Sequence, residues 1–425
     1  MKTIKSLCGM LAVLAFTACS NDSDEATGSD NHIWHVTLTA SMGDATHRAL
    51  DADGNTITAS FAAGDVVEVV RADGSPVGPL TAKTTGASTT LEGNISGTFA
   101  ADEVLKLRYR SATANYDGQE GTLAGIAAGQ DYAEGTLTVK TADPLTFASN
   151  SVTLKSKQSI TKFSFNDGTN PINIKTFGIA AEGLVQSISA KGTETVGAVT
   201  GTLATPSSDV YVALRNKETG TKTYSFTIQD KDGNWYIFTK DANLTNGKNY
   251  TATVTLPTKL PTLNSGSAVG TVGVIAGLPA IVVDFSGTKK AVALMNAGAL
   301  CPEHYGKYYT FANLSSLGLP IGWYVPTKDE FDALVGKTNA WVTQNGVAGR
   351  QYTIVTGKTL FFPAAGYDLD PSHSWTDVTT LGYYWSLTSA DTNYGYCYSF
   401  SSDSNNTNSH DKDDGLSVRP FHPLP

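Results

Sequence analysis

Charged residues are scarce in this chain, and basic residues are fewer than acidic ones. Only 16% of the 425 residues are Asp, Glu, Lys or Arg, and the formal net charge is -9. Lys and Arg nowhere gather in a cluster of more than two or three residues. Because nucleic-acid binding requires a basic face, the composition argues against that class of function.

Long apolar runs, cysteine frameworks and enzyme motifs are also missing. No apolar stretch reaches the roughly 18 residues that a membrane-spanning helix needs. The four cysteines are too few for a disulfide scaffold, and their spacing matches no zinc site. There is no His-Glu-x-x-His, no Gly-x-Ser-x-Gly and no phosphate-binding loop, and the seven histidines are scattered. We therefore predict that the protein is not an enzyme.

Small residues and turn formers take the place of the charged ones. The chain has 41 glycines, is rich in Thr, Ser and Ala, and is 40% hydrophobic, which is enough to build cores. This composition favours short β-strands joined by turns over helical bundles. Its length predicts about three domains.

The N-terminal residues carry an export signal. Lys2 and Lys5 precede an apolar stretch from Leu7 to Phe16, and small residues and Cys19 follow. A cysteine at this point resembles a bacterial lipobox, which implies removal of a signal peptide at 1–18 and acylation of Cys19. The alternative is a plain secretory signal with a coincidental cysteine.

The rest of the chain divides into blocks by pattern and composition. Apolar residues alternate with polar ones from Trp34 to Ala40, as in a strand with one buried face. Short strand-like runs separated by turn signals follow, as in β-sandwiches. The expected divisions are a tether with the first strand at 19–48, β-sandwiches at 49–149 and 150–257, a linker at 258–267 and a last domain at 268–425.

The last block contains the clearest helix signal. Thr327 and Glu330 have the spacing of a capping box, in which each side chain bonds the other residue's backbone N–H. Phe331 and Leu334 then give the helix an apolar face. Gly336 stands where a left-handed cap would end it.

Three features in the first two blocks resemble those of one family. They are the lipobox, the stretch Phe61-Ala-Ala-Gly-Asp-Val-Val-Glu-Val, and a closing strand with Leu244 and Gly247-Lys-Asn-Tyr250. In this order they resemble the fimbrillins, the type V pilins of Bacteroides-group bacteria. The resemblance covers 34–257 and implies two tandem transthyretin-like, Greek-key β-sandwiches.

Five stretches of the last block match a further family. They are Ala280–Asp284 with Ala291–Leu294, Gly322–Leu334, Leu360–Tyr367, Gly382–Ser386 and Gly415–Pro420. They resemble the C-type-lectin-like domains found at the end of some of these pilins. The expected fold is therefore mainly β, with two pilin β-sandwiches followed by an α+β C-type-lectin-like domain.

The fimbrillin resemblance implies polymerisation by strand exchange. A trypsin-like protease cuts after an Arg, the first strand leaves, and a neighbour's strand takes its place. Arg48-Ala49 follows the alternating strand in a small, polar segment that suits protease access. The alternative is an ordinary loop arginine.

The last residues of the chain indicate a position in the polymer. Pro420, Pro423 and Pro425 lie among the last six residues. Because proline has no amide to give to a ladder, this segment is unsuited to donate a strand. We expect a subunit that receives a strand without donating one, which is a pilus tip.

Ligand-binding residues are less sharply indicated. The Glu-Pro-Asn or Gln-Pro-Asp loop and the Trp-Asn-Asp strand of calcium-dependent C-type lectins are absent, so we expect no metal or other cofactor. Carboxylates could still bind calcium and aromatic rings could stack on a sugar, although a solvated loop and core packing explain the same residues. The candidates are Asp368, Asp370, Trp375, Tyr394 and Tyr396, with Asp411, Asp413 and Asp414 as further oxygen ligands.

Two cysteines fall in the last domain, where export permits oxidation. Either Cys301 and Cys397 form a disulfide, or both are buried free thiols. The sequence leaves both alternatives open.

Together these features predict the tip adhesin of a type V pilus. It is expected to be an exported lipoprotein of the outer membrane and cell surface, and then part of the fimbrium. Its expected partners are a stalk or adaptor subunit that donates a β-strand and a carbohydrate or surface ligand, but no nucleic acid. The alternative is a monomeric surface lipoprotein that binds glycans, which would have no use for a first strand released at Arg48.

Overall fold

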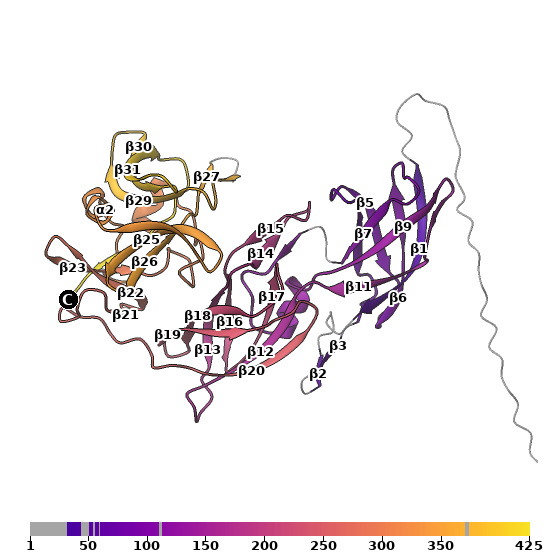
Figure 1. The fold of residues 1–425 in the computed structure, drawn as a ribbon, viewed down its shortest axis with the longest axis horizontal. Helices are drawn as coiled ribbons and strands as arrows, with labels where there is room; N and C mark the ends of the chain where they lie inside the picture. Colours follow the sequence, from indigo (N-terminus) through magenta and orange to yellow (C-terminus); the bar gives the residue numbers. More distant parts are fainter. Residues whose placement is uncertain (1–31, 44–50, 54–55, 59, 110–112, 370–373) are drawn as a thin grey trace, which may run out of the picture.

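We describe the protein from a computed structural model that places residues 32–43, 51–53, 56–58, 60–109, 113–369 and 374–425 (Figure 1). These residues form 32 β-strands, two α-helices and one 3-10 helix, which confirms the mainly β class. The strands gather in three groups that follow one another along the molecule in Figure 1. Within these ranges, no helix has the length and apolar character needed to cross a membrane.

The first group is a sheet that closes on itself, which we call the first barrel. Its order is β10-β9-β11-β1-β6-β5-β4-β7, and β9 also pairs with β7. The strands are β1 (Ile33–Gly43), β4 (Val66–Val70), β5 (Pro76–Ala82), β6 (Ser88–Ser96), β7 (Val104–Tyr109), β9 (Ala133–Ala142), β10 (Leu145–Phe147) and β11 (Ser151–Ser156). A separate hairpin, β2 (Asp51–Asp53) and β3 (Thr56–Thr58), lies between β1 and β4 in the chain.

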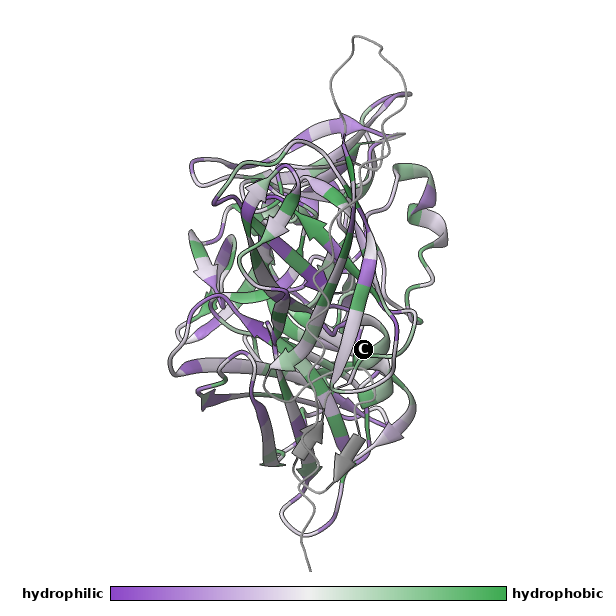
Figure 2. Ribbon diagram, turned by 90° about the vertical axis from the view of Figure 1, so that its right-hand side faces the viewer, coloured by the Kyte–Doolittle hydropathy of each residue, from purple (hydrophilic) through white to green (hydrophobic). Residues whose placement is uncertain are grey.

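The first barrel is one closed sheet and not the expected β-sandwich of two sheets, and one strand explains its closure. Ala133 and Glu134 of β9 pair with β11 along one edge and with β7 along the other. These two residues thereby join the ends of what would be an open sheet. Hydrophobic and hydrophilic residues alternate along the strands (Figure 2), so that one face of the barrel wall lines a single core.

The second group is a β-sandwich, which we call the second sandwich. One sheet has the order β15-β14-β17-β12-β20, with β8 on β14, and the other has the order β16-β13-β18-β19. The elements are β8 (Ala114–Asn115), α1 (Leu123–Gly129), β12 (Ser159–Asn166), β13 (Ile174–Ala180), β14 (Leu184–Ile188), β15 (Glu194–Val196), β16 (Val199–Ser207), β17 (Asp209–Asn216), β18 (Lys222–Asp230), β19 (Trp235–Ala242) and β20 (Asn249–Thr255).

The division between these two groups differs from the expected boundary at 149/150. Strand β11 lies beyond that boundary, yet Val152 and Leu154 are buried in the core of the first barrel. Conversely, Tyr116 and Ile126 precede the boundary and are buried in the core of the second sandwich. The chain crosses between the two groups three times, because the segment with β8 and α1 leaves the barrel before β9 returns to it.

The third group, which we call the third unit, comprises four small sheets, one α-helix and one 3-10 helix. The sheet orders are β21-β22-β23-β32, β24-β25-β26, β27-β28 and β29-β30-β31. The elements are β21 (Val272–Ile275), β22 (Leu278–Phe285), β23 (Thr288–Ala293), η1 (Phe311–Ser316), α2 (Lys328–Val335), β24 (Asn339–Gln344), β25 (Val347–Val355), β26 (Lys358–Pro363), β27 (Tyr367–Leu369), β28 (Ser374–Thr376), β29 (Gly382–Ser389), β30 (Tyr394–Phe400), β31 (Asn405–Asp411) and β32 (Phe421–Pro423).

Helix α2 confirms the predicted capping box and the predicted end at Gly336, but not the left-handed conformation of that glycine. Thr327 and Glu330 exchange both side-chain-to-backbone bonds, and Phe331 and Leu334 are buried. Gly336 ends the helix with a φ of -68°, in the right-handed region. The left-handed cap is not needed, because the Gly336 N–H still bonds the Asp332 carbonyl oxygen (3.2 Å).

The expected linker at 258–267 is packed against its neighbours. Leu263 is buried in the third unit, and the Leu260 N–H donates to the Trp235 carbonyl oxygen of the second sandwich (2.8 Å). The Trp235 indole in turn donates to the Gly277 carbonyl oxygen (3.0 Å). Leu263 and Leu260, which packs against the cluster around Trp235, thus give the segment 258–267 apolar contacts that a flexible linker lacks.

Candidate functional site

Strand β1 is an internal strand of the first barrel and forms part of its core. Trp34, Val36, Leu38 and Ala40 point inward and are buried, whereas the residues between them are exposed. This confirms the strand that the alternating sequence pattern predicted. Burying a Val or Leu side chain contributes about 1.5–3 kcal/mol, so this row is a substantial part of the stability of the barrel.

The two edges of β1 are bonded unequally. Residues 33–41 pair antiparallel with β6, whereas only residues 39–43 pair with β11, and in the parallel sense. Among the residues that the structure describes, the first half of β1 therefore has a strand partner on one edge alone. Strand β1 is held less completely than a strand paired along its whole length on both sides.

The outward face of β1 carries a polar contact set. Both ring nitrogens of His35 lie 3.1 Å from an oxygen atom, Nε2 from Glu92 Oε1 and Nδ1 from Asn94 Oδ1. The Lys83 ammonium lies 2.7 Å from the other oxygen of Glu92. Because these groups are largely exposed, the contribution of this polar contact set to the stability of the barrel is small.

Two predicted processing residues lie outside the part of the chain that the structure describes. Arg48 and Ala49 fall between the end of β1 at Gly43 and the hairpin of β2 and β3. Cys19, the predicted lipidation site, precedes the first described residue. Their roles stay predictions.

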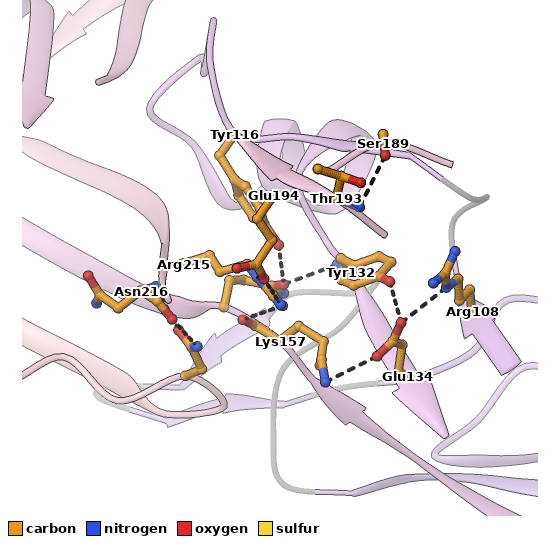
Figure 3. A network of polar contacts seen from close by, with 12 residues as sticks. Arg108, Tyr116, Tyr132, Glu134, Lys157, Ser189, Thr193, Glu194, Arg215 and Asn216 are labelled. Atoms are coloured by element: carbon orange, nitrogen blue, oxygen red, sulfur yellow. Dashed lines mark hydrogen bonds and ion pairs between the residues drawn. The ribbon is translucent and has the colours of Figure 1, made fainter. Parts of the chain in front are cut away.

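A buried ionic network joins the first barrel to the second sandwich (Figure 3). Arg108 of β7 donates from Nη1 to the Ala190 carbonyl oxygen, between β14 and β15 (2.6 Å), and its Nε pairs with Glu134 of β9 (3.1 Å). The Tyr132 hydroxyl donates to Glu134 (2.6 Å), and the Lys157 ammonium lies 3.1 Å from it. Burial acts to raise the pKa of Glu134, but Tyr132 and the two cations outweigh it and hold this pKa below its usual value.

A second arginine completes the network from the other side. Arg215 of β17 pairs with Glu194 of β15 and donates from Nη1 to the Lys157 carbonyl oxygen (3.1 Å). Lys157 follows β11 directly, and β11 is a ladder partner of β1. Strand β1 is therefore connected, through β11 and Lys157, to the polar network between the first barrel and the second sandwich.

The predicted ligand residues of the third unit fall in two separate ladders. Asp368 pairs with Trp375 across β27 and β28, while Asp370 lies outside the described residues. Tyr394 and Tyr396 lie two residues apart on β30 in another sheet. Tyr394 is exposed, and the Lys328 ammonium lies 5.4 Å from the centre of the Tyr396 ring.

A further aromatic cluster was not predicted from the sequence. The His410 ring lies 5.1 Å from that of Tyr367 and 5.0 Å from that of Tyr383, measured between centres. Asp414 Oδ2 is 3.3 Å from His410 Nδ1. The three rings come from separate strands, β27, β29 and β31, so no local pattern in the sequence could have brought them together.

Neither a metal cluster nor the disulfide appears among the residues placed by the structure. No three His, Cys, Asp or Glu side chains there group so as to hold a metal ion. Cys301 and Cys397 are both buried free thiols, which answers the alternative left open by the sequence. They belong to different cores, because Cys301 packs on Ala180 and Ala198 of the second sandwich and Cys397 lies within the third unit. Burial raises the pKa of the Cys397 thiol to about 12.

Comparisons with known proteins give one partial family match and several structural neighbours. A family described as a domain of unknown function, DUF8237, matches residues 341–421. No curated protein matches the chain. The solved structures that match include those of adhesion and fimbrial proteins, each over about half of this chain.

Three such neighbours illustrate the range. Proteins described as a "putative cell adhesion protein" come from Bacteroides uniformis (16% identity, 52% of this chain and 92% of that one, TM-score 0.33) and from Bacteroides ovatus (15%, 53% and 95%, TM-score 0.31). A fimbrial assembly protein from Parabacteroides distasonis is 10% identical over 53% of this chain and 92% of that one, with a TM-score of 0.30.

Proposed function

We propose that this protein is an adhesin subunit at the tip of a type V pilus and joins the polymer by protease-triggered strand exchange. The observation that supports this best is the place of β1. It fills the core of the first barrel with alternating side chains and is bonded to β6 and β11. Removing such a strand exposes ladder groups and apolar pockets, and an extended strand of another chain has the complementary chemistry for both.

Cleavage at Arg48-Ala49 is the proposed trigger. Water hydrolyses this peptide bond in the protease active site, which separates β1 from the rest of the chain. While β1 remains covalently attached, it returns to its groove at a high effective concentration. After the cut, the groove is open to competition from a donor strand.

The segment 412–425 supports an accepting rather than a donating role. Phe421–Pro423 forms β32, which pairs with β23 in the third unit. Val418 and Phe421 are fully buried, so that donating these residues would unfold their own domain. A synthetic 412–425 peptide should therefore fail to complement a cleaved stalk subunit, and complementation would contradict the tip position.

The third unit is the proposed adhesive part, with the C-type-lectin-like fold that its sequence resembles. It lies at the end of the molecule opposite the first barrel in Figure 1. A subunit attached to the pilus through its first barrel would thus hold the third unit away from the attachment point. Tyr394, Tyr396 and Asp368 are the proposed starting points for a search for carbohydrate or surface ligands.

Cys19 is the proposed point of attachment to the outer membrane before processing. Acylation with more than one chain anchors a protein stably, since each buried methylene contributes about 0.8 kcal/mol. Labelling with an alkyne fatty acid should mark the wild type but not Cys19→Ala. Equal labelling of the two would contradict a lipoprotein.

A monomeric glycan-binding lipoprotein is the competing function. The first barrel favours it in one respect, because β1 already completes the barrel within the chain itself. The two proposals differ in whether β1 is ever released.

The decisive experiment follows β1 in cells that assemble the pilus. Assembled wild-type protein should have Ala49 as its N-terminus by Edman or mass-spectrometric sequencing. Arg48→Ala should accumulate as membrane-bound protein that retains β1 and does not enter fibres, whereas the neighbouring control His47→Ala should assemble normally. Assembly of Arg48→Ala at the wild-type level would overturn the proposal.

A further inference from the structure

The groove filled by β1 holds inward side chains of markedly different sizes. Trp34, Val36, Leu38 and Ala40 occupy successive inward positions, and Ala40 has no exposed surface. The next inward residue, Met42, is only partly buried against the same core. Their antiparallel partners on β6 include the buried Ile95 and Leu91, so the floor of the groove is formed by packed side chains. The order of sizes is therefore a property of the site as well as of the strand.

The narrowest part of the groove is fixed by the groups around Ala40. Thr89 lies opposite it on β6, and Val152 lies beside it on β11; both are buried. The Thr89 hydroxyl accepts a hydrogen bond from the Thr84 N–H (3.0 Å), which holds its side chain in place. The Ser88 hydroxyl donates to the Ala40 carbonyl oxygen (3.0 Å) and positions the backbone. A longer side chain at this point has no space to enter without displacing these groups.

The end of β1 imposes a second restriction. Gly43 pairs with Lys155 on β11. A Cβ atom added at Gly43 would lie only 2.4 Å from Cγ2 of Thr153, the methyl of a β-branched side chain. Any residue other than glycine would therefore have to displace Thr153 or bend the strand.

We propose, on the basis of the strand exchange proposed above, that the groove selects a donor strand of one pattern, polarity and register. The pattern is a large aromatic residue, then a β-branched residue, then Leu, then Ala at alternate positions, with Gly three residues after the Ala. The donor runs antiparallel to β6 and parallel to β11, as β1 does. The outward residue at the position of His35 is basic or neutral, because Glu92 lies beside it.

The order of side-chain sizes is what makes the register unique. A slip of one residue would turn the polar residues of the donor into the core. A slip of two residues keeps the correct face inward but moves a Leu into the space of Ala40 or an aromatic residue into that of Val36. A donor with the reversed order of residues would place Val36 in the space of Ala40 and Met42 in the space of Trp34.

The proposal can be tested with peptides on a nicked chain. In the full-length protein, residues 45–50 are replaced by the recognition sequence of a site-specific protease, so that the nick does not depend on Arg48. After nicking, fluorescein-labelled peptides with the sequence of residues 33–43 are added, and their binding is followed by anisotropy. The peptides are the wild type, Ala40→Leu, Gly43→Val, and a peptide with the reversed order of residues. Thr39→Leu, at an outward-facing position, is the control.

We expect the wild-type and Thr39→Leu peptides to exchange into the groove with affinities within about threefold of each other. The Ala40→Leu, Gly43→Val and reversed peptides should bind at least tenfold more weakly. Binding of Ala40→Leu as tight as that of the wild type would overturn the selection rule while leaving strand exchange intact. Failure of every peptide to bind, with the nick complete, would overturn the proposed strand exchange and the rule with it.

Discussion

Glu303 is a buried carboxylate in the third unit, close to the contact with the second sandwich. Its Oε1 accepts hydrogen bonds from the side-chain amides of Gln344 (2.9 Å) and Asn345 (2.6 Å). The adjacent His304 pairs with Asp117 of the second sandwich (2.8 Å). Burial raises the pKa of Glu303, although the two amides act in the opposite direction. The charged form is thus disfavoured at this point of the fold.

This raised pKa predicts a pH dependence of stability. The folded state holds the Glu303 proton more tightly than the unfolded state. Protonated Glu303 therefore contributes fully to the free energy of unfolding below the usual Glu pKa. This contribution is lost as the pH rises through the raised pKa that Glu303 has in the folded state. Glu303→Gln keeps an acceptor oxygen and removes the charge. Relative to the wild type, it should raise the urea midpoint at pH 7 and lose this advantage toward pH 4. The exposed control Glu218→Gln should show no such trend; a pH-independent difference for Glu303→Gln would contradict the assignment.

Strand β1 is the element on which assembly is proposed to depend. Its inward row belongs to the barrel core, and its outward row is exposed. The stability of the intact chain should therefore respond to one row and not to the other. This can be measured without any partner or protease.

We expect Leu38→Ala to lower the free energy of unfolding of the first barrel by about 2–5 kcal/mol, through lost burial and the cavity left behind. Thr37→Ala, the neighbouring outward control, should change it by no more than about 0.5 kcal/mol. Urea unfolding of the intact chain, followed by Trp fluorescence, measures both. Equal effects of the two substitutions would show that β1 does not pack as the structure has it.

At the scale of the whole molecule, two junctions hold the three groups together. Arg108 links the first barrel to the carbonyl oxygen of Ala190 in the second sandwich. Cys301 packs against Ala180 and Ala198 to dock the third unit on the second sandwich. Both junctions are made by buried side chains, so we expect the chain to behave as a stiff rod.

Arg108→Met tests the first of these junctions. The substitution removes the bond from Arg108 to the Ala190 carbonyl oxygen, which links the two groups. It also leaves Glu134 partly buried with one positive partner fewer. Calorimetry should show the first barrel and second sandwich unfolding in more separated transitions than in the wild type, and small-angle scattering should show a broader range of molecular dimensions. Lys106→Met, two residues earlier on β7, is the control and should leave both unchanged. A single unchanged transition for Arg108→Met would argue against the junction.

Local patterns in the sequence were sufficient for the features that depend on neighbours in the chain. The alternation from Trp34 to Ala40 predicted β1 because successive residues of a strand face opposite sides. The spacing of Thr327 and Glu330 predicted the start of α2, since a capping box closes within one helical turn. The mainly β class followed from composition in the same way.

The tertiary structure decided which distant segments meet. Nothing in residues 33–43 indicates that β11, more than 100 residues later, pairs with them in parallel, or that Ala133 and Glu134 bond two neighbours and close the barrel. The order of side-chain sizes can likewise be read from β1. Thr89, Val152 and Thr153, on other strands, determine which side chains fit. Such pairings depend on competition among many strands of similar pattern, and only the complete set of buried contacts determines which pairings prevail.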